Sequence, residues 1–187
     1  YVGFKPAPAG ESMTEPQFKN VIIFGVGLIG GSFALALRKA NAVGEVVGFG
    51  RSESTLQQAQ QLGIIDRIGQ GAAAEAADAD LILLATPVGQ MAEIMARIAP
   101  YLGARTLITD GGSTKSDVVR AVYAQLGSKA AQFVPAHPIA GAELSGAAAA
   151  RAGLYVGKKV VLTPLPENTP EAVARVQAAW QACGANI

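Results

Sequence analysis

A buried strand followed directly by a glycine-rich turn and a helix constrains the fold of this chain more than any other feature. Residues 21–24 are a continuous apolar run, residues 25–30 read Gly-Val-Gly-Leu-Ile-Gly, and a helical pattern covers residues 28–40. A continuous apolar run is typical of a strand that is buried on both faces of a parallel sheet. The turn matches G-x-G-x-x-G in the strand–turn–helix context in which that pattern binds dinucleotides.

Each glycine of the turn has its own expected task. Gly25 permits the tight turn, Gly27 lets the backbone approach a pyrophosphate, and Gly30 allows the helix to pack closely on the strand. The amides of Leu28 and Ile29, at the positive end of the helix, are expected to face the phosphates. The alternative is a glycine-rich turn that binds no ligand. The flanking strand and helix favour the dinucleotide site.

Apolar runs and helical patterns alternate along the rest of the chain. Strands are predicted at residues 45–49, 81–84, 106–109, 132–135 and 160–163. Helices are predicted at residues 54–62 (capped by Ser52), 88–98, 115–126 and 171–183, with a helical turn at residues 147–152. This alternation predicts the α/β fold class, with a doubly wound, mostly parallel, Rossmann-like sheet and helices on both faces.

The two ends of the chain differ from this pattern. Residues 1–19 contain three prolines and no clear periodicity, so we expect a flexible N-terminal lead-in. Residues 20–187 are then expected to form the dinucleotide-binding domain. Residues 184–187 follow the last helix and are expected to enter another strand, which suggests that the sequence stops before a second part of the protein.

Composition limits the partners that the chain is expected to bind. The formal net charge is +1 and there is no basic run, which gives no electrostatic reason to expect nucleic acid or an anionic membrane. The uncharged residues 21–37 are slightly short for a membrane span and contain the glycine turn. The single cysteine, Cys183, cannot form an internal disulfide and fits a reducing cytoplasm. With one histidine and one cysteine, no metal site is expected.

The end of the second predicted strand indicates which cofactor is preferred. A chain that selects NAD usually places an acidic residue there, where it binds the ribose hydroxyls. Here Gly50 stands at that position and is followed by Arg51 and Ser52. The guanidinium and the hydroxyl suit a 2′-phosphate, so the sequence favours NADP, with NAD as a possible cofactor. The alternative is that Arg51 is a solvated charge and Glu53 binds the ribose.

Two further strand ends carry candidate site residues. Thr86 and Pro87 follow the strand at residues 81–84 and are expected either to form a wall beside the cofactor or simply to turn the chain. Residues 110–115 read Asp-Gly-Gly-Ser-Thr-Lys and open the next helix. Ser113 or Thr114 is expected to cap that helix. The Ser113 hydroxyl is also a candidate to reach into the same crevice.

The only histidine of the chain, His137, lies about a hundred residues beyond the glycine turn, within Ala-His-Pro-Ile-Ala-Gly-Ala-Glu-Leu-Ser-Gly at residues 136–146. An imidazole titrates near neutrality and therefore suits a general base that takes the proton of a substrate hydroxyl. The alternative is an ordinary histidine of the surface or core.

Four segments together resemble one known family. Gly-Val-Gly-Leu-Ile-Gly-Gly-Ser, Ala-Thr-Pro-Val, Asp-Gly-Gly-Ser-Thr-Lys and His-Pro-Ile-Ala-Gly-Ala-Glu-Leu-Ser-Gly occur in that order, at residues 25–32, 85–88, 110–115 and 137–146. They resemble the nucleotide-binding domain of the prephenate/arogenate dehydrogenase family of tyrosine biosynthesis, over residues 20–187. The resemblance implies oxidative decarboxylation of prephenate or arogenate, with hydride transfer to NADP or NAD.

The resemblance also implies roles for single residues. His137 would accept a hydrogen bond from the substrate hydroxyl and draw its proton. Ser113 would bond the same hydroxyl or orient His137, and Glu143 would lie at the mouth of the substrate pocket. The helical second domain of the family, which forms its homodimer and supplies a basic group for the ring carboxylate, is absent from this chain. The Gly50–Arg51 pair departs from the acidic residue of NAD-using members.

Two other functions remain open at this point. One is another dehydrogenase of the β-hydroxyacid type, whose nucleotide domain is similar but whose catalytic lysine lies in a second domain. The other is a non-catalytic NADP-binding sensor module. All three would bind NADP, so turnover, and not cofactor binding, separates them.

Overall fold

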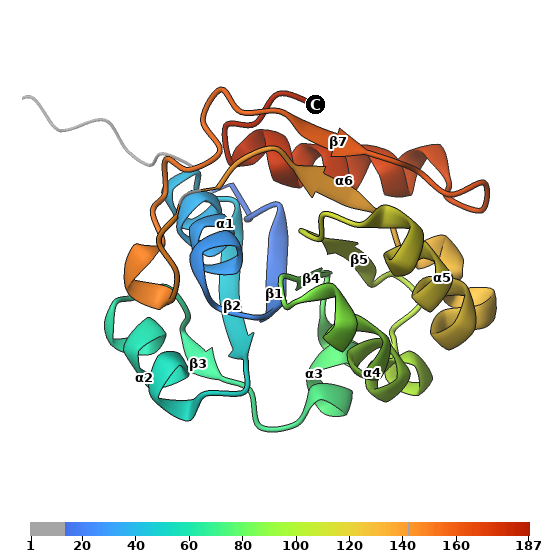
Figure 1. The fold of residues 1–187 in the computed structure, drawn as a ribbon, viewed down its shortest axis with the longest axis horizontal. Coiled ribbons are helices and arrows are strands. Elements are labelled where there is room, and N and C mark those ends of the chain that lie inside the picture. The colour runs from blue at the N-terminus through green and yellow to red at the C-terminus, as the bar shows by residue number, and fades with distance from the viewer. Residues whose placement is uncertain (1–13, 142) are drawn as a thin grey trace, which may run out of the picture.

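A computed structural model describes residues 14–141 and 143–187 of the chain (Figure 1). Residues 1–13 of the expected lead-in lie outside the described residues. The strands are β1 (Phe18–Phe24), β2 (Val43–Phe49), β3 (Arg67–Ile68), β4 (Leu81–Leu84), β5 (Leu107–Asp110), β6 (Ala136–Pro138) and β7 (Val160–Leu162). The α-helices are α1 (Leu28–Lys39), α2 (Glu53–Gln61), α3 (Ala72–Asp78), α4 (Val88–Ile98), α5 (Lys115–Leu126) and α6 (Pro170–Ala182). Short 3₁₀ turns are η1 (Ala99–Tyr101), η2 (Gly127–Gln132) and η3 (Ala147–Ala149).

Five strands form one parallel sheet in the order β3-β2-β1-β4-β5. The order reverses beside β1, which is the doubly wound arrangement predicted from the alternation of strands and helices. The register aligns the last residues of four strands in one row across the sheet: Phe49, Phe24, Leu84 and Asp110. Every loop that follows this row therefore leaves the sheet at the same carboxyl edge.

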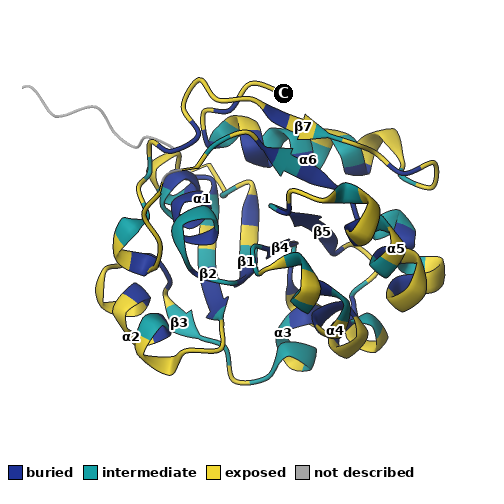
Figure 2. Ribbon diagram, viewed as in Figure 1, coloured by how far each residue is buried: buried dark blue, intermediate teal, exposed yellow. Residues whose placement is uncertain are grey.

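Both faces of the sheet are covered, which explains the continuous apolar run of β1. Val21 and Ile23 pack into a core with α1, α2 and α6. Ile22 and Phe24 point to the opposite face and pack against α3, α4 and α5. Strand β4 is accordingly buried along its whole length and β1 is buried over residues 21–24, whereas the outer surfaces of the helices are exposed (Figure 2).

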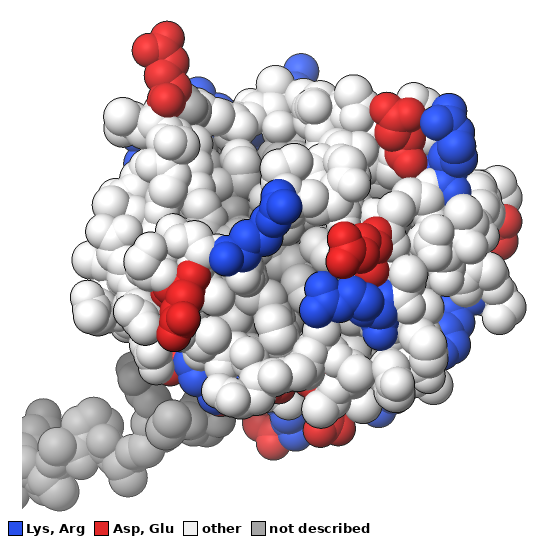
Figure 3. Space-filling view, turned by 60° about the horizontal axis from the view of Figure 1, so that its bottom comes forward, with Lys and Arg blue, Asp and Glu red and all other residues white. Residues whose placement is uncertain are grey.

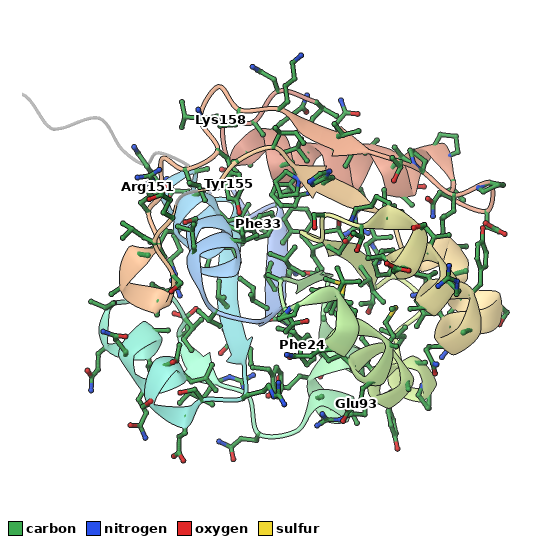
Figure 4. All side chains as sticks on the ribbon, viewed as in Figure 1. Phe24, Phe33, Glu93, Arg151, Tyr155 and Lys158 are labelled. Atoms are coloured by element: carbon green, nitrogen blue, oxygen red, sulfur yellow. The ribbon has the colours of Figure 1, made fainter. Side chains whose placement is uncertain are left out.

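Helix α1 is held by segments from the last third of the chain (Figure 4). The amide of Arg151 donates to Ser32 Oγ at 2.9 Å, and the Tyr155 hydroxyl donates to the carbonyl of Ile29 at 2.7 Å. The Tyr155 ring packs edge-on against Trp180, with 5.3 Å between the ring centroids. Trp180 is itself fully buried.

The strand predicted at residues 132–135 is wrong. Gln132 ends η2, and its side-chain amide donates to two carbonyls of the loop before β5. Phe133 forms only one isolated bridge to Ile108, and Pro135 has no amide hydrogen with which to continue a ladder. The strand starts instead at Ala136 and pairs antiparallel with β7, outside the parallel sheet.

Other differences are smaller. β1 begins at Phe18, three residues before the apolar run that predicts it, and the short elements β3 and α3 are not predicted at all. Ser52 caps α2 as expected, because its Oγ accepts the Thr55 amide. The predicted side-chain cap of α5 by Ser113 or Thr114 is wrong, because the helix begins after Thr114 without one. None of the described helices has the length and apolar character needed to cross a membrane.

Candidate functional site

A cavity of about 580 Å³ opens at the carboxyl edge of the sheet, where the loops after β1, β2 and β4 meet. Its volume lies within the range of pockets that hold small molecules and cofactors. This edge faces the lower side of Figure 1, and Figure 3 turns it forward to show basic side chains on both sides of a hollow. The predicted cofactor residues that line the cavity are Gly25, Gly27, Arg51, Ser52, Thr86 and Pro87.

The three glycines of the turn occupy different surroundings. Gly25 has a φ of +90°, and a Cβ there would lie 2.7 Å from the carbonyl oxygen of Ala85. A Cβ on Gly30 would overlap the carbonyl of Gly25 and lie 2.8 Å from Ile23 Cγ2. A Cβ on Gly27 would meet no atom of the described chain within 4 Å, because Gly27 faces the open cavity. Two glycines thus serve packing, and the third leaves room for a ligand.

The N-terminus of α1 adjoins this open space. The first amides of a helix have no partner within it, and α1 has neither a side-chain cap nor an acidic residue in its first turn. The side chains of Leu28 and Ile29 pack against the core, and neither these two residues nor Gly30 lines the cavity. Their expected contribution is therefore limited to backbone amides, which suit an anion.

The floor of the cavity is apolar and contains one unsatisfied hydroxyl. The Phe24 and Phe49 rings stack with 4.9 Å between their centroids. Thr86 Oγ1 is buried and has no hydrogen-bond partner among the described residues. A buried polar atom without a partner is costly, so this hydroxyl suits a ligand that bonds it. The bare Gly27, the uncapped helix and Thr86 together fit a dinucleotide.

Arg51 and Ser52 stand beside the end of β2, as predicted. Arg51 is exposed, lines the cavity, and makes no ion pair with a carboxylate of the described residues. Glu53 does not line the cavity; its carboxylate accepts from Gln57 Nε2 at 3.3 Å along α2. Arg51, and not Glu53, therefore borders the ligand space.

Sequence reasoning missed the opposite wall, which belongs to α4. Gln90, Glu93 and Arg97 line the cavity from this helix, and Figure 4 shows Glu93 and Phe24 on the same lower side of the molecule. The three polar residues recur at helical spacing after Pro87, on the flank beside the buried Met91 and Ile94. That spacing was the available signal, but it does not distinguish a cavity wall from a solvated helix face.

A second cluster lies at the end of β5 and centres on Asp110, the one charged residue that is buried in the described part of the chain. Its Oδ2 accepts the Gly112 amide at 2.9 Å and the Lys115 ammonium, while Oδ1 accepts the Ala136 amide at 3.0 Å. Burial raises the pKa of Asp110 and lowers the pKa of Lys115, and the attraction between the two groups opposes both shifts.

The candidate catalytic residues lie beside this cluster and not in the cavity lining. His137 is half-buried in β6, directly after Ala136, and Ser113 is exposed in the loop directly after Gly112. Glu143 is exposed in the loop between β6 and η3. Cys183 is buried, which raises the pKa of its thiol and gives it no nucleophilic thiolate near neutral pH.

Comparison with known proteins identifies the family. Residues 33–187 match the family model described as prephenate dehydrogenase, nucleotide-binding domain. The chain belongs to this family. The resemblance noted in the sequence motifs is thereby confirmed, and the five-stranded parallel sheet is the nucleotide-binding fold of a prephenate dehydrogenase.

Three relatives show how much of the family this chain covers. A prephenate dehydrogenase of Lactococcus lactis is 38% identical over 149 residues, which are 78% of this chain and 41% of the relative. The structure of prephenate dehydrogenase from A. aeolicus, in complex with hydroxyphenyl propionate and NAD+, has a TM-score of 0.82 and 35% identity, over 90% of this chain and 58% of that one. Arogenate dehydrogenase of Synechocystis has a TM-score of 0.80 and 27% identity, over 90% and 58%. The chain thus spans about half the length of these relatives.

Proposed function

We propose that this chain provides the nucleotide-binding and proton-accepting part of a dehydrogenase that oxidatively decarboxylates prephenate or arogenate in tyrosine biosynthesis. Residues 20–187 act as one dinucleotide-binding domain. The cavity at the carboxyl edge holds the cofactor, with the pyrophosphate against Gly27 and the amides of Leu28, Ile29 and Gly30. Thr86 and Pro87 form a wall beside it.

The bound nicotinamide would accept the hydride that leaves the ring carbon bearing the hydroxyl, as carbon dioxide departs and the ring becomes aromatic. His137 accepts the proton of that hydroxyl at an imidazole nitrogen, which favours the departure of the hydride by placing electron density on the oxygen. Ser113 bonds the same hydroxyl or orients His137. Glu143 lies in the exposed loop after β6, from which it would border the substrate.

One observation carries the proposal. The loop with Ser113 leaves the row of strand ends that also borders the cavity, and β6 with His137 is tied to the same strand end by Asp110. An imidazole and a hydroxyl are thus carried by segments joined to the edge where open α/β sheets bind their ligands, which supports the proposal. A sensor module would need the cavity but not this second cluster.

Turnover of the natural full-length protein tests the proposal. Prephenate and arogenate are each offered with NADP+ and with NAD+, and the formation of reduced nicotinamide is measured. We expect turnover with at least one acid. Tight binding of NADP+ without turnover of either acid would contradict the substrate class and leave a nucleotide-binding domain. The four combinations also identify the preferred acid and the preferred cofactor.

We further propose that NADP is preferred over NAD because Arg51 and Ser52 bind the 2′-phosphate. Replacing Arg51 by alanine should weaken NADP+ binding about tenfold to hundredfold, since hydrogen bonds to charged groups contribute about 1.5–3 kcal/mol. Binding of NAD+, which lacks the phosphate, should change less than about twofold. Both dissociation constants are measured by calorimetry.

Arg120→Ala is the matched control for Arg51→Ala. It also removes one guanidinium, but from an exposed position on α5 that does not line the cavity. This variant should bind both nucleotides as the wild type does. An unchanged ratio of NADP+ to NAD+ affinity in Arg51→Ala would contradict the proposed role of this residue.

The assembly of the whole protein follows the same proposal. We propose a homodimer that forms through a helical second domain, as the resemblance to the family implies. Sedimentation of the natural full-length protein measures this directly, and a monomer that turns over its substrate would contradict it.

A further inference from the structure

The Asp110 carboxylate accepts hydrogen bonds from two backbone amides. Each amide belongs to the residue directly before a candidate catalytic residue. Oδ2 accepts the amide of Gly112, which precedes Ser113, and Oδ1 accepts the amide of Ala136, which precedes His137. This one carboxylate thus joins the loop after β5 to the start of β6. Ala136 lies 26 residues beyond Asp110 in the sequence. Because an amide group lies only one residue from the next Cα, fixing it also restricts the following side chain.

The surroundings leave this carboxylate little freedom to move. Its side chain is fully buried, and it lies on the last ladder position of β5 opposite Leu84. A Cβ on Gly112 would lie 2.9 Å from Oδ2 and 3.0 Å from Val88 Cγ2, so the loop closes tightly over the carboxylate. Lys115, whose side chain is 17% exposed, supplies the positive charge that a buried carboxylate requires.

We infer, on the basis of the proposed function, that Asp110 is a positioning residue that fixes the Ser113 loop and the His137 strand relative to each other. It does not touch the substrate. Asp110 acts through the backbone, and it holds the His137 imidazole and the Ser113 hydroxyl so that both can reach the hydroxyl of the substrate. Misplacement of a catalytic group by about 1 Å lowers a rate on the order of a hundredfold, so loss of this carboxylate should affect turnover more than binding.

Asp110→Asn tests the inference. The amide keeps one oxygen for the Ala136 amide but places an NH₂ group against the Gly112 amide and the Lys115 ammonium. We expect kcat of the natural full-length protein to fall about tenfold to hundredfold. The dissociation constant for NADP+ should stay within about twofold of wild type, because Asp110 does not line the cavity.

Thr109→Val is the matched control. Thr109 is the neighbouring residue of the same strand, is also fully buried, and donates from its hydroxyl to the Val134 carbonyl at 2.9 Å. Removing this bond also loosens β5 from the chain before β6, but it leaves the Asp110 contacts intact. This variant should melt at a lower temperature and keep its kcat. If both variants lose kcat in proportion to their loss of Tm, the role of Asp110 is only structural and the inference is overturned.

Amide hydrogen exchange on this chain gives a second readout that needs no turnover. The Gly112 amide, which loses its acceptor in Asp110→Asn, should exchange at least about tenfold faster in this variant. The Val134 amide, which bonds the Ile108 carbonyl at 2.8 Å, serves as the internal reference and should not change. If Asp110→Asn does not fold, the double variant with Lys115→Met removes both buried charges and is measured in the same way.

The outcomes separate this inference from the proposed function. If the wild-type protein turns over neither acid, the proposed function fails. If the wild type is active and Asp110→Asn keeps its kcat, only the inference fails. Unchanged exchange at Gly112 in a folded Asp110→Asn variant also overturns the inference, because the carboxylate would then not hold the Ser113 loop.

Discussion

Replacing His137 by asparagine is expected to lower kcat about a hundredfold to ten-thousandfold, which is the usual loss when a general base is removed. Affinity for NADP+ should remain within about twofold, because His137 lies in β6 and does not line the cavity. Steady-state turnover of the natural full-length protein, together with a nucleotide titration, measures both quantities. Added imidazole that restores turnover in this variant would act in place of the missing His137 side chain.

Val161→Thr is a suitable control for His137→Asn. Val161 lies directly opposite His137 in the β6–β7 pair and is 45% exposed. Threonine keeps the β-branched shape that strands favour, so the pair should form normally and kcat should stay within about threefold. A His137→Asn variant that keeps most of its turnover would show that the proton goes to another group.

Gly30→Ala and Gly27→Ala should separate the stability of the turn from its ability to bind. In Gly30→Ala the new methyl group overlaps the Gly25 carbonyl, and backbone cannot swing aside as a flexible side chain can. Overpacking of this kind costs about 2–3 kcal/mol, which lowers Tm by roughly 4–12 °C for a chain of this size. Thermal unfolding followed by circular dichroism measures the shift.

Gly27→Ala should show the opposite result. Its methyl group meets no protein atom within 4 Å, so Tm should stay within about 2 °C of wild type. The same methyl group would project toward the space proposed for the pyrophosphate and should weaken NADP+ binding at least about tenfold. A Gly27→Ala protein that binds NADP+ normally would place the phosphates elsewhere.

Local sequence patterns were sufficient for four of the five strands of the parallel sheet, all but β3, and for its glycine turn. The apolar runs of β1 and β4 are buried on both faces, and this burial leaves a signal that a short window of sequence contains. The failure at residues 132–135 has a different origin. Phe133 and Val134 are apolar, as residues of a buried strand usually are. The hydrogen-bond partners of this segment, however, are Thr109 and carbonyls of the loop before β5. Such distant hydrogen bonds are not visible in the segment itself.

The sequence predicted the site residues at strand ends but not those on α4. Arg51 and Thr86 follow strand ends, and the rule that ligands bind at the carboxyl edge was enough to select them. Glu93 and Arg97 were missed because their helix reaches the cavity only through the fold. The contacts of Asp110 with Gly112 and Ala136 depend on how β6 returns beside β5, and the sequence contains no local trace of that return.

Helix α1 is covered by segments that are synthesised long after it, so its contacts form in a fixed order during translation. The glycine turn leaves the ribosome early, but the Tyr155 hydroxyl that bonds Ile29 is 126 residues further along the chain. At about 5–20 residues per second, translation of that interval takes roughly 6–25 s. During this time the nascent helix α1 lacks its contacts with Arg151 and Tyr155. The contacts that hold α1 are therefore complete only after Tyr155 has been synthesised.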